Sequence, residues 1–166
     1  MLHSYKVFNY PPYTNGLVLD IHSISDINHA NHVVKDCDGN IVRNVAVFGL
    51  NDSGKSMFVK SFESLKHLIL ADNYDSALLD LFDDIRNEHK WLRYELEFSN
   101  SGFLYTYDIT IDSDNDIDEY LYLNFDGQNK LIFSNISSRI EILDDNDSMI
   151  EFSLDVSEQE RGLYSH

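Results

Sequence analysis

The sequence is poor in cysteine and proline. It has one cysteine, Cys37, among 166 residues. A single thiol excludes an internal disulfide framework and a multi-cysteine zinc cluster, so we interpret Cys37 as a lone reduced thiol near a turn. The two prolines, Pro11 and Pro12, are adjacent, and together with Asn15-Gly16 they predict a break between two strands.

Positive charge is also scarce. Twelve Lys and Arg residues stand against 29 Asp and Glu residues, which gives a formal net charge of -17. A field of this sign repels nucleic-acid backbones and anionic membrane surfaces. We therefore expect that this chain alone does not bind nucleic acid directly.

Long hydrophobic runs are missing as well. The N-terminal "MLHSYKVFNY" lacks the basic start and apolar core of a signal peptide, and no apolar run approaches the roughly 18 residues of a membrane span. Hydrophobic residues make up 43% of the chain and aromatic residues 13%, enough for the core of one ordinary domain. We expect a soluble, cytoplasmic protein without membrane contact, in which residues 1–166 form a single domain.

The first third of the chain is typical of β structure. The segments "YKVFNY" and "GLVLDIHSI" predict a hairpin, and Asp38-Gly39 predicts the turn of a second hairpin between Val33-Val34 and Ile41-Val42. The apolar run Val45 to Phe48 predicts a buried strand.

Two helices are expected next. From Ser56 to about Leu70, apolar residues recur every three or four positions, which is the helical period. A second candidate, "YDSALLDLFDDIRNEHKWL", places Leu78, Leu79, Phe82 and Ile85 on one face and acidic residues on a solvated face.

After Trp91 the pattern changes to alternation. Polar turns such as Asn100-Ser101-Gly102 and Asp126-Gly127 separate short alternating segments, which predicts an antiparallel meander packed on one face. The six strand candidates are "RYELEFS", "FLYTYDITI", "DEYLYLNF", "KLIFS", "SRIEIL" and "MIEFSLDV".

The stretch "GLNDSGKS" satisfies the P-loop pattern G-x-x-x-x-G-K-[ST] between a predicted strand and a predicted helix. Gly49 and Gly54 allow a tight turn whose N–H groups surround a phosphate. Lys55 supplies charge to the β- and γ-phosphates beside the positive end of the helix, and the Ser56 hydroxyl is a ligand for Mg²⁺. The alternative is an ordinary strand-to-helix turn capped by Ser53.

Hydrolysis requires a second carboxylate, usually at the end of a buried apolar strand. The nearest candidate is "SRIEILDD", in which Ile140, Ile142 and Leu143 precede Asp144 and Asp145. Its alternation is typical of an antiparallel strand and not of a buried parallel one. The sequence therefore predicts nucleotide binding more strongly than hydrolysis.

Two weaker patterns concern metal ions. Asp112 to Glu119 resembles an oxygen-rich calcium loop but has Ile117 and Leu123 where an EF-hand requires Gly and Glu, so a solvated acidic turn is favoured. The seven histidines are scattered. His29 and His32 are close together, but no HExxH pattern or cysteine partner accompanies them, and we interpret the histidines as surface or loop residues.

The order of features resembles the N-terminal part of the ABC-like AAA ATPases of bacterial phage-resistance systems, which share a clan with the OLD-family nucleases, RecF and the SMC heads. Members carry a variant of G-x-N-x-S-G-K-S, and a generic P-loop leaves the Asn and Ser positions free. The similarity is greatest from Val45 to Leu70 and extends through Phe133. The matching positions here are Gly49, Asn51, Ser53, Gly54, Lys55 and Ser56.

The resemblance implies an α/β (α+β) P-loop NTPase fold of the ABC type: a β-rich N-terminal lobe with a P-loop helix and an antiparallel meander, incomplete at residue 166. It implies ATP and Mg²⁺ as cofactors, with Lys55 as the catalytic residue and Ser56 as the metal ligand. The family's signature motif, Walker B segment and catalytic Glu are not recognisable in this sequence. The predicted nucleotide-binding residues are Gly49, Asn51, Asp52, Ser53, Gly54, Lys55, Ser56 and Met57.

Two classes of function follow. The first is the ATP-binding lobe of an ABC-like ATPase, acting in phage defence as a homodimer or paired with a longer ATPase or effector chain, and hydrolysing ATP only when a missing part completes it. The second is a non-hydrolysing regulatory or interaction protein that retains the P-loop fold and uses its meander edge or acidic face for contact. A third, an acidic decoy for another protein's DNA groove, does not account for the P-loop.

Overall fold

The computed structural model describes residues 1–11, 13, 15–23, 30–70, 80–83, 88, 90–114, 116–125, 127–136, 139–143 and 149–153. The elements, in chain order, are β1 (Leu2–Phe8), β2 (Leu17–Asp20), the 3-10 helix η1 (Ala30–His32), β3 (Val33–Asp36), β4 (Gly39–Val42), α1 (Lys55–Leu70), β5 (Leu92–Asn100), β6 (Phe103–Ile111), β7 (Ile117–Phe125), β8 (Gln128–Ile136), β9 (Arg139–Leu143) and β10 (Met149–Ser153).

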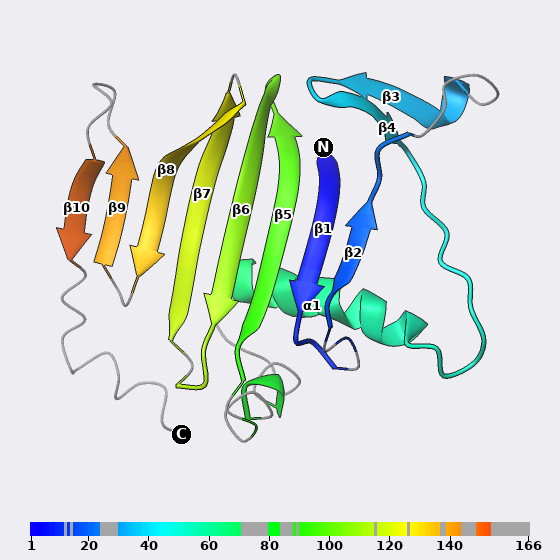
Figure 1. Cartoon of the computed structure of the whole chain (residues 1–166), viewed down its shortest axis with the longest axis horizontal. Coiled ribbons are helices and arrows are strands. Elements are labelled where there is room, and N and C mark those ends of the chain that lie inside the picture. Colours follow the sequence, from blue (N-terminus) through cyan, green and yellow to red (C-terminus); the bar gives the residue numbers. More distant parts are fainter. Residues whose placement is uncertain are drawn as a thin grey trace.

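The chain has a mixed α/β fold dominated by one antiparallel sheet. Its eight strands are ordered β10-β9-β8-β7-β6-β5-β1-β2, and β3 and β4 form a separate hairpin (Figure 1). The six strands predicted after Trp91 are all present and follow one another as an antiparallel meander, so that prediction is confirmed. The N-terminal hairpin of β1 and β2 adds to the free edge of β5.

Tight turns determine the register of the meander. Asn100 pairs with Phe103 across a two-residue turn in which Ser101 and Gly102 have φ angles of 53° and 83°. Positive φ at both central positions is the geometry whose twist matches a hairpin, and Gly102 adopts it without steric cost. This turn sets β6 against β5 along nine paired residues.

The core lies between one face of the sheet and α1, which crosses that face behind β1 and β5 (Figure 1). Val7 of β1 pairs with Tyr94 of β5, which pairs with Ile109 of β6, and these three side chains are almost fully buried. Leu65 and Leu68 of α1 pack against the same cluster. The apolar residues repeat every second position in the strands and every third or fourth in the helix, so one face of each element is buried.

The opposite face of the central strands is polar. Lys6 pairs with Glu95, and the Arg93 Nε donates to both carboxylate oxygens of Asp108, at 2.9 and 3.0 Å. The Asp108 carboxylate raises the pKa of the Arg93 guanidinium, because it stabilises the charged form. This alternation of apolar and charged residues specifies which face of β1, β5 and β6 receives the helix.

The second hairpin differs slightly from the prediction. β3 and β4 pair as expected, but Asp36 pairs with Gly39, so the two turn residues are Cys37 and Asp38. Gly39, with φ at 101°, begins β4 instead of occupying the turn. Cys37 is exposed at this turn, as expected for a lone thiol.

The predicted second helix, residues 74–92, lies mostly outside the described residues. Within it, residues 80–83 form a helical turn. Leu81 and Phe82 of this turn are buried in the core, which agrees with the expected apolar face at Phe82. None of the described helices is long and apolar enough to cross a membrane.

The prediction of a buried strand from Val45 to Phe48 is wrong. These residues are in no strand, and Val45 and Val47 are about half exposed, while Phe48 is 90% exposed. A strand requires a neighbour for its N–H and C=O groups, and the described sheet ends at β2 without a strand beyond it. The segment has the apolar composition of a buried strand, but it lacks the neighbouring strand that would bury it.

The buried tyrosines predict alkaline unfolding. Burial raises the pKa of Tyr5, Tyr94 and Tyr107 above the ordinary value of about 10. Above about pH 10 the unfolded state binds fewer protons than the folded state, so the free energy of unfolding should fall as the pH rises. We expect the tyrosinate absorbance of these three buried residues to appear together with the loss of the circular dichroism signal of the folded chain. Ionisation of every tyrosine near the ordinary pKa with unchanged circular dichroism would contradict this.

Candidate functional site

The loop with the P-loop pattern leads directly into α1. The helix begins at Lys55, one residue before the predicted start, and Phe58 N donates to Gly54 O at 3.0 Å as its first turn closes. Gly54 has φ at 87° and Asp52 has φ at 61°, so the chain reverses sharply just before the helix. The first backbone N–H groups of a helix have no intrahelical acceptor, and here they follow this reversal.

The two glycines of the motif have different roles. Gly54 adopts a left-handed conformation that other residues rarely occupy. Gly49 has no positive φ, but a Cβ there would lie 2.6 Å from Ser53 Oγ. The expectation that both glycines permit a turn therefore holds for Gly54, whereas Gly49 permits close packing within the loop.

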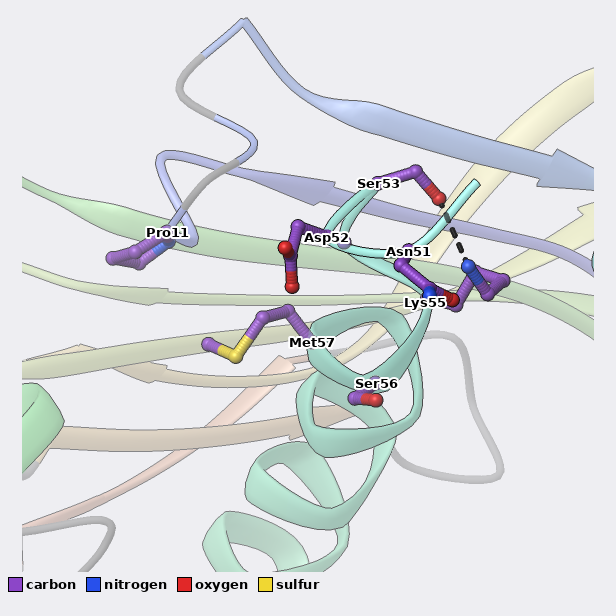
Figure 2. A pocket seen from close by; sticks show the side chains of 8 residues that line it. Pro11, Asn51, Asp52, Ser53, Lys55, Ser56 and Met57 are labelled. Carbon is purple, nitrogen blue, oxygen red and sulfur yellow. Dashed lines mark hydrogen bonds between the residues drawn. The ribbon is translucent and has the colours of Figure 1, made fainter. Parts of the chain in front are cut away.

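Lys55 folds back over its own loop. Its Nζ donates to Gly49 O at 2.9 Å and to Leu50 O. It also donates to Ser53 Oγ at 3.2 Å (Figure 2). Within the described part of the chain it has no carboxylate partner. The ammonium group is thus held by neutral oxygens, which an anion can replace at lower cost than it could replace an ion pair.

A surface pocket of about 670 Å³ lies at the start of α1. Figure 2 shows Pro11 and Met57 on one side of it, with Ser53 and Lys55 on the other. Asp52 is the one carboxylate among the lining residues, which all belong to the described part of the chain. The lining residues are Pro11, Asn51, Asp52, Ser53, Gly54, Lys55, Ser56 and Met57.

The structure therefore brings together seven of the eight predicted nucleotide-binding residues at one pocket. The eighth, Gly49, lies beneath the Lys55 ammonium group as one of its acceptors. Two residues outside the motif also belong to this region: Pro11, predicted only as part of a turn, lines the pocket, and the Tyr13 hydroxyl donates to Gly54 O at 2.7 Å. Nothing in the spacing of the motif could have found them, because the β1–β2 turn meets the loop only in three dimensions.

The helix that carries the loop is anchored to the sheet by Tyr5. The Tyr5 hydroxyl donates to Ser61 Oγ at 2.8 Å, and Ser61 Oγ donates to Phe58 O at 2.7 Å. The Tyr5 ring also stacks on Phe62, with ring centroids 3.8 Å apart. These contacts fix the first turns of α1, and hence the loop, relative to β1.

The weak Walker B candidate lies far from this pocket. Residues 139–143 form β9, which is antiparallel to both neighbours and separated from β1 by four strands. Five interstrand spacings of about 4.8 Å amount to roughly 24 Å. Asp144 and Asp145 lie outside the described residues. The antiparallel character expected for this segment is confirmed.

The acidic stretch after β6 is a turn held by hydrogen bonds among its own residues. Asp112 Oδ1 accepts hydrogen bonds from the backbone N–H groups of Asp114, at 2.8 Å, and Asp116, at 3.0 Å. Asp112 N in turn donates to Asp116 O at 3.1 Å. This agrees with the interpretation of the stretch as a solvated acidic turn.

Comparison with known proteins does not extend the argument. No protein-family model and no curated protein sequence matches this chain.

Proposed function

We propose that the chain binds a nucleoside triphosphate with Mg²⁺ through residues 49–57. The observation that carries the proposal is the joint placement of a left-handed Gly54, a helix start and Lys55 at one open pocket. Backbone N–H groups that follow a sharp turn and lead into a helix form an anion site, and a sixteen-residue helix adds its positive end. An ordinary turn into a helix would not by itself require a lysine at this position.

The phosphates lie at the helix start in this proposal. Lys55 leaves Gly49 O, Leu50 O and Ser53 Oγ and contacts the β- and γ-phosphates, while the exposed hydroxyl of Ser56 reaches Mg²⁺. Bonds from the ammonium group to phosphate join opposite charges and are stronger than its present bonds to neutral oxygens, so binding supplies the free energy for this movement.

The apolar side of the pocket accommodates the base. Pro11 and Met57 lie opposite Lys55 (Figure 2), and a flat heteroaromatic ring is favoured by such surfaces. The choice of ATP comes from the resemblance to ABC-like phage-resistance ATPases, as does a role in antiviral defence. The same resemblance favours an ABC-type P-loop NTPase fold and a homodimer or a longer ATPase as partner.

We expect binding without turnover. Hydrolysis needs a carboxylate that orients water and supports Mg²⁺, and among the described residues Asp52 is the only carboxylate lining the pocket. Asp52 belongs to the loop itself, where a carboxylate also opposes phosphate binding. ATPase activity would therefore depend on a carboxylate from another segment or another chain.

Calorimetric titration of the purified chain with Mg-ATPγS tests the proposal, with phosphate release from ATP followed in parallel. Saturable one-to-one binding and no release support a nucleotide-holding site. Titration with Mg-GTP tests the base preference separately, since the phosphate contacts are common to both nucleotides. No binding of either nucleotide would exclude the proposed function.

An interaction protein is the second candidate, and the exposed segment before the loop favours it. Phe48 is 90% exposed and Leu50 is 85% exposed. A second pocket of about 240 Å³ shares Ser53 and Lys55 and is lined by Val47 and Phe48 together with residues of β2. Exposed apolar surface of this kind is typical of a contact site for another chain.

A dye-binding measurement tests the exposure of this surface. The wild-type chain is expected to enhance the fluorescence of the hydrophobic dye ANS, and Val47→Ser with Phe48→Ser should remove most of that signal. Because both side chains project into solvent, the free energy of unfolding should change by no more than about 0.5 kcal/mol. Phe125→Ser is the matched control, because Phe125 is an exposed aromatic residue at the end of β7 and does not line this pocket. An unchanged signal in the double variant would show that the segment is covered.

A further inference from the structure

A cluster of histidine and carboxylate side chains lies away from the loop of residues 49–57. Its residues come from the start of β1, the end of β2 and the β3–β4 hairpin, which lies beside the start of β1 (Figure 1). His3 of β1 is completely buried. Ile21 N donates to His3 O at 3.0 Å, and His22 forms a β-bridge with Ile41 of β4. These backbone contacts bring β1, the end of β2 and the second hairpin together.

Each of the two imidazole rings is oriented by a carboxylate. His3 Nε2 lies 3.2 Å from Asp36 Oδ2, and His22 Nδ1 lies 2.7 Å from Asp20 Oδ1. A carboxylate only accepts hydrogen bonds, so the nitrogen facing it carries the proton in the neutral ring. The opposite nitrogen of His3, Nδ1, therefore presents a lone pair, and His22 Nε2, which faces Asp38 Oδ2 at 3.4 Å, presents one when a bound metal ion displaces its proton.

Both of these nitrogens are buried and form no hydrogen bond of good geometry. A buried polar atom without a hydrogen bond is costly, so His3 Nδ1, in a completely buried side chain, calls for a ligand. A carboxylate that binds one ring nitrogen while the other stays open is the arrangement found around metal-binding histidines.

A third ligand completes the cluster. His3, His22 and Asp38 each offer one ligand atom, and these three atoms lie within 4.8 Å of one another. The distance between Asp38 Oδ2 and His22 Nε2 is 3.4 Å. Tetrahedral bonds of about 2.0–2.1 Å place ligand atoms about 3.3 Å apart, so His22 and Asp38 already have the required separation. The two imidazole rings are 5.3 Å apart between centroids and inclined at 71°, so they do not stack against each other.

We propose that His3, His22 and Asp38 bind Zn²⁺, with a water molecule as the fourth ligand. Two imidazoles and one carboxylate suit zinc, whereas Mg²⁺ and Ca²⁺ favour oxygen ligands throughout. The net charge of -17 attracts cations to the chain. The ion ties the β3–β4 hairpin to β1, and this site is independent of the proposed nucleotide site.

Asp36 serves as an outer partner in this site. Its carboxylate accepts from Ser99 Oγ, from Cys37 N at 2.7 Å and from the His3 ring. A second grouping of His3, Asp36 and Cys37 also lies within 4.8 Å. Those three bonds already occupy Asp36, so the structure assigns the zinc to the group that contains His22 and Asp38.

The interpretation of all histidines as surface or loop residues is wrong for His3, which is completely buried in β1. His3 and His22 are far apart in sequence and follow no metal-binding spacing. They meet because β2 pairs with β1 and the hairpin bridges to His22.

The test is calorimetric titration of the chelator-treated full chain with Zn²⁺ alone, with melting temperature measured in parallel. We expect one zinc per chain and a rise in melting temperature. His22→Gln and Asp38→Asn should each weaken binding about 100-fold or more, and Asp20→Asn, which releases the His22 ring, about 10- to 100-fold. His32→Gln, an exposed histidine outside the group, should bind zinc like the wild type.

Two outcomes would overturn the proposal. One is wild-type zinc affinity in both His22→Gln and Asp38→Asn. The other is loss of binding in Cys37→Ser with retention in His22→Gln, which would place the ion at the second grouping. Asp38 is half exposed at a turn, so Asp38→Asn should keep the fold. This variant therefore remains informative even if His22→Gln does not fold. Circular dichroism of each variant verifies this.

Discussion

Lys55→Ala is expected to lower the affinity of the chain for Mg-ATPγS by about 100-fold or more, since a hydrogen bond to a charged group contributes up to about 3 kcal/mol. Lys55 is the one cation that lines the pocket of about 670 Å³ among the described residues. In the free chain its ammonium group is bonded to the loop oxygens of Gly49, Leu50 and Ser53. Its removal leaves the phosphates with the backbone N–H groups and the helix end alone.

The matched control is Lys66→Ala. Lys66 is exposed on the same helix, and eleven residues at about 1.5 Å each place it about 16 Å further along α1. Both variants change the net charge equally, so a general electrostatic effect would weaken binding in both. Equal affinity of Lys55→Ala and the wild type would refute the proposed phosphate contact. Lys55→Ala should bind zinc like the wild type, because the proposed zinc ligands come from β1, the end of β2 and the β3–β4 turn.

Tyr5→Ala is expected to lower the free energy of unfolding by about 3–5 kcal/mol, as for other large-to-small aromatic substitutions in a core. Tyr5 is completely buried, stacks on Phe62 and contacts Ser61 of α1. Its loss leaves a cavity between the sheet and the helix that carries the P-loop. Denaturant titration monitored by circular dichroism gives the value.

Tyr5→Phe separates packing from hydrogen bonding. It keeps the ring and removes only the hydroxyl that donates to Ser61 Oγ, which still donates to Phe58 O. We expect a loss of about 1 kcal/mol, the usual net contribution of one hydrogen bond. A loss in Tyr5→Ala no larger than in Tyr5→Phe would show that the ring is not packed between sheet and helix. If nucleotide binding weakens in Tyr5→Ala at a temperature where it remains folded, the anchor also positions the loop.

Much of the architecture follows from local sequence signals. The meander was predictable because alternation at period two places one face of each strand inside, and turns such as Ser101-Gly102 permit only nearby antiparallel pairing. The helix after the P-loop was predictable to within one residue from its apolar period. The pocket residues were predictable as a set because seven of them are consecutive, so the turn and helix start place them together.

The remaining features depended on contacts between segments distant in sequence. Val45 to Phe48 has the composition of a buried strand, but burial requires a neighbouring strand, and none lies beyond β2 in the described sheet. Tyr13 contacts Gly54 only because the β1–β2 turn folds against the loop before α1. A contact between two single residues far apart in the sequence leaves no periodic pattern from which it could be predicted.

The sequence by itself determined the antiparallel meander, the helix from Lys55 and the turn that leads into it, since each is specified by residues within a few positions of one another. Tertiary structure alone decided that the segment before the loop is exposed and that His3, His22 and Asp38 converge. The physical reason is that strand order and hairpin placement arise from the free energy of the whole packed sheet, which no local pattern encodes.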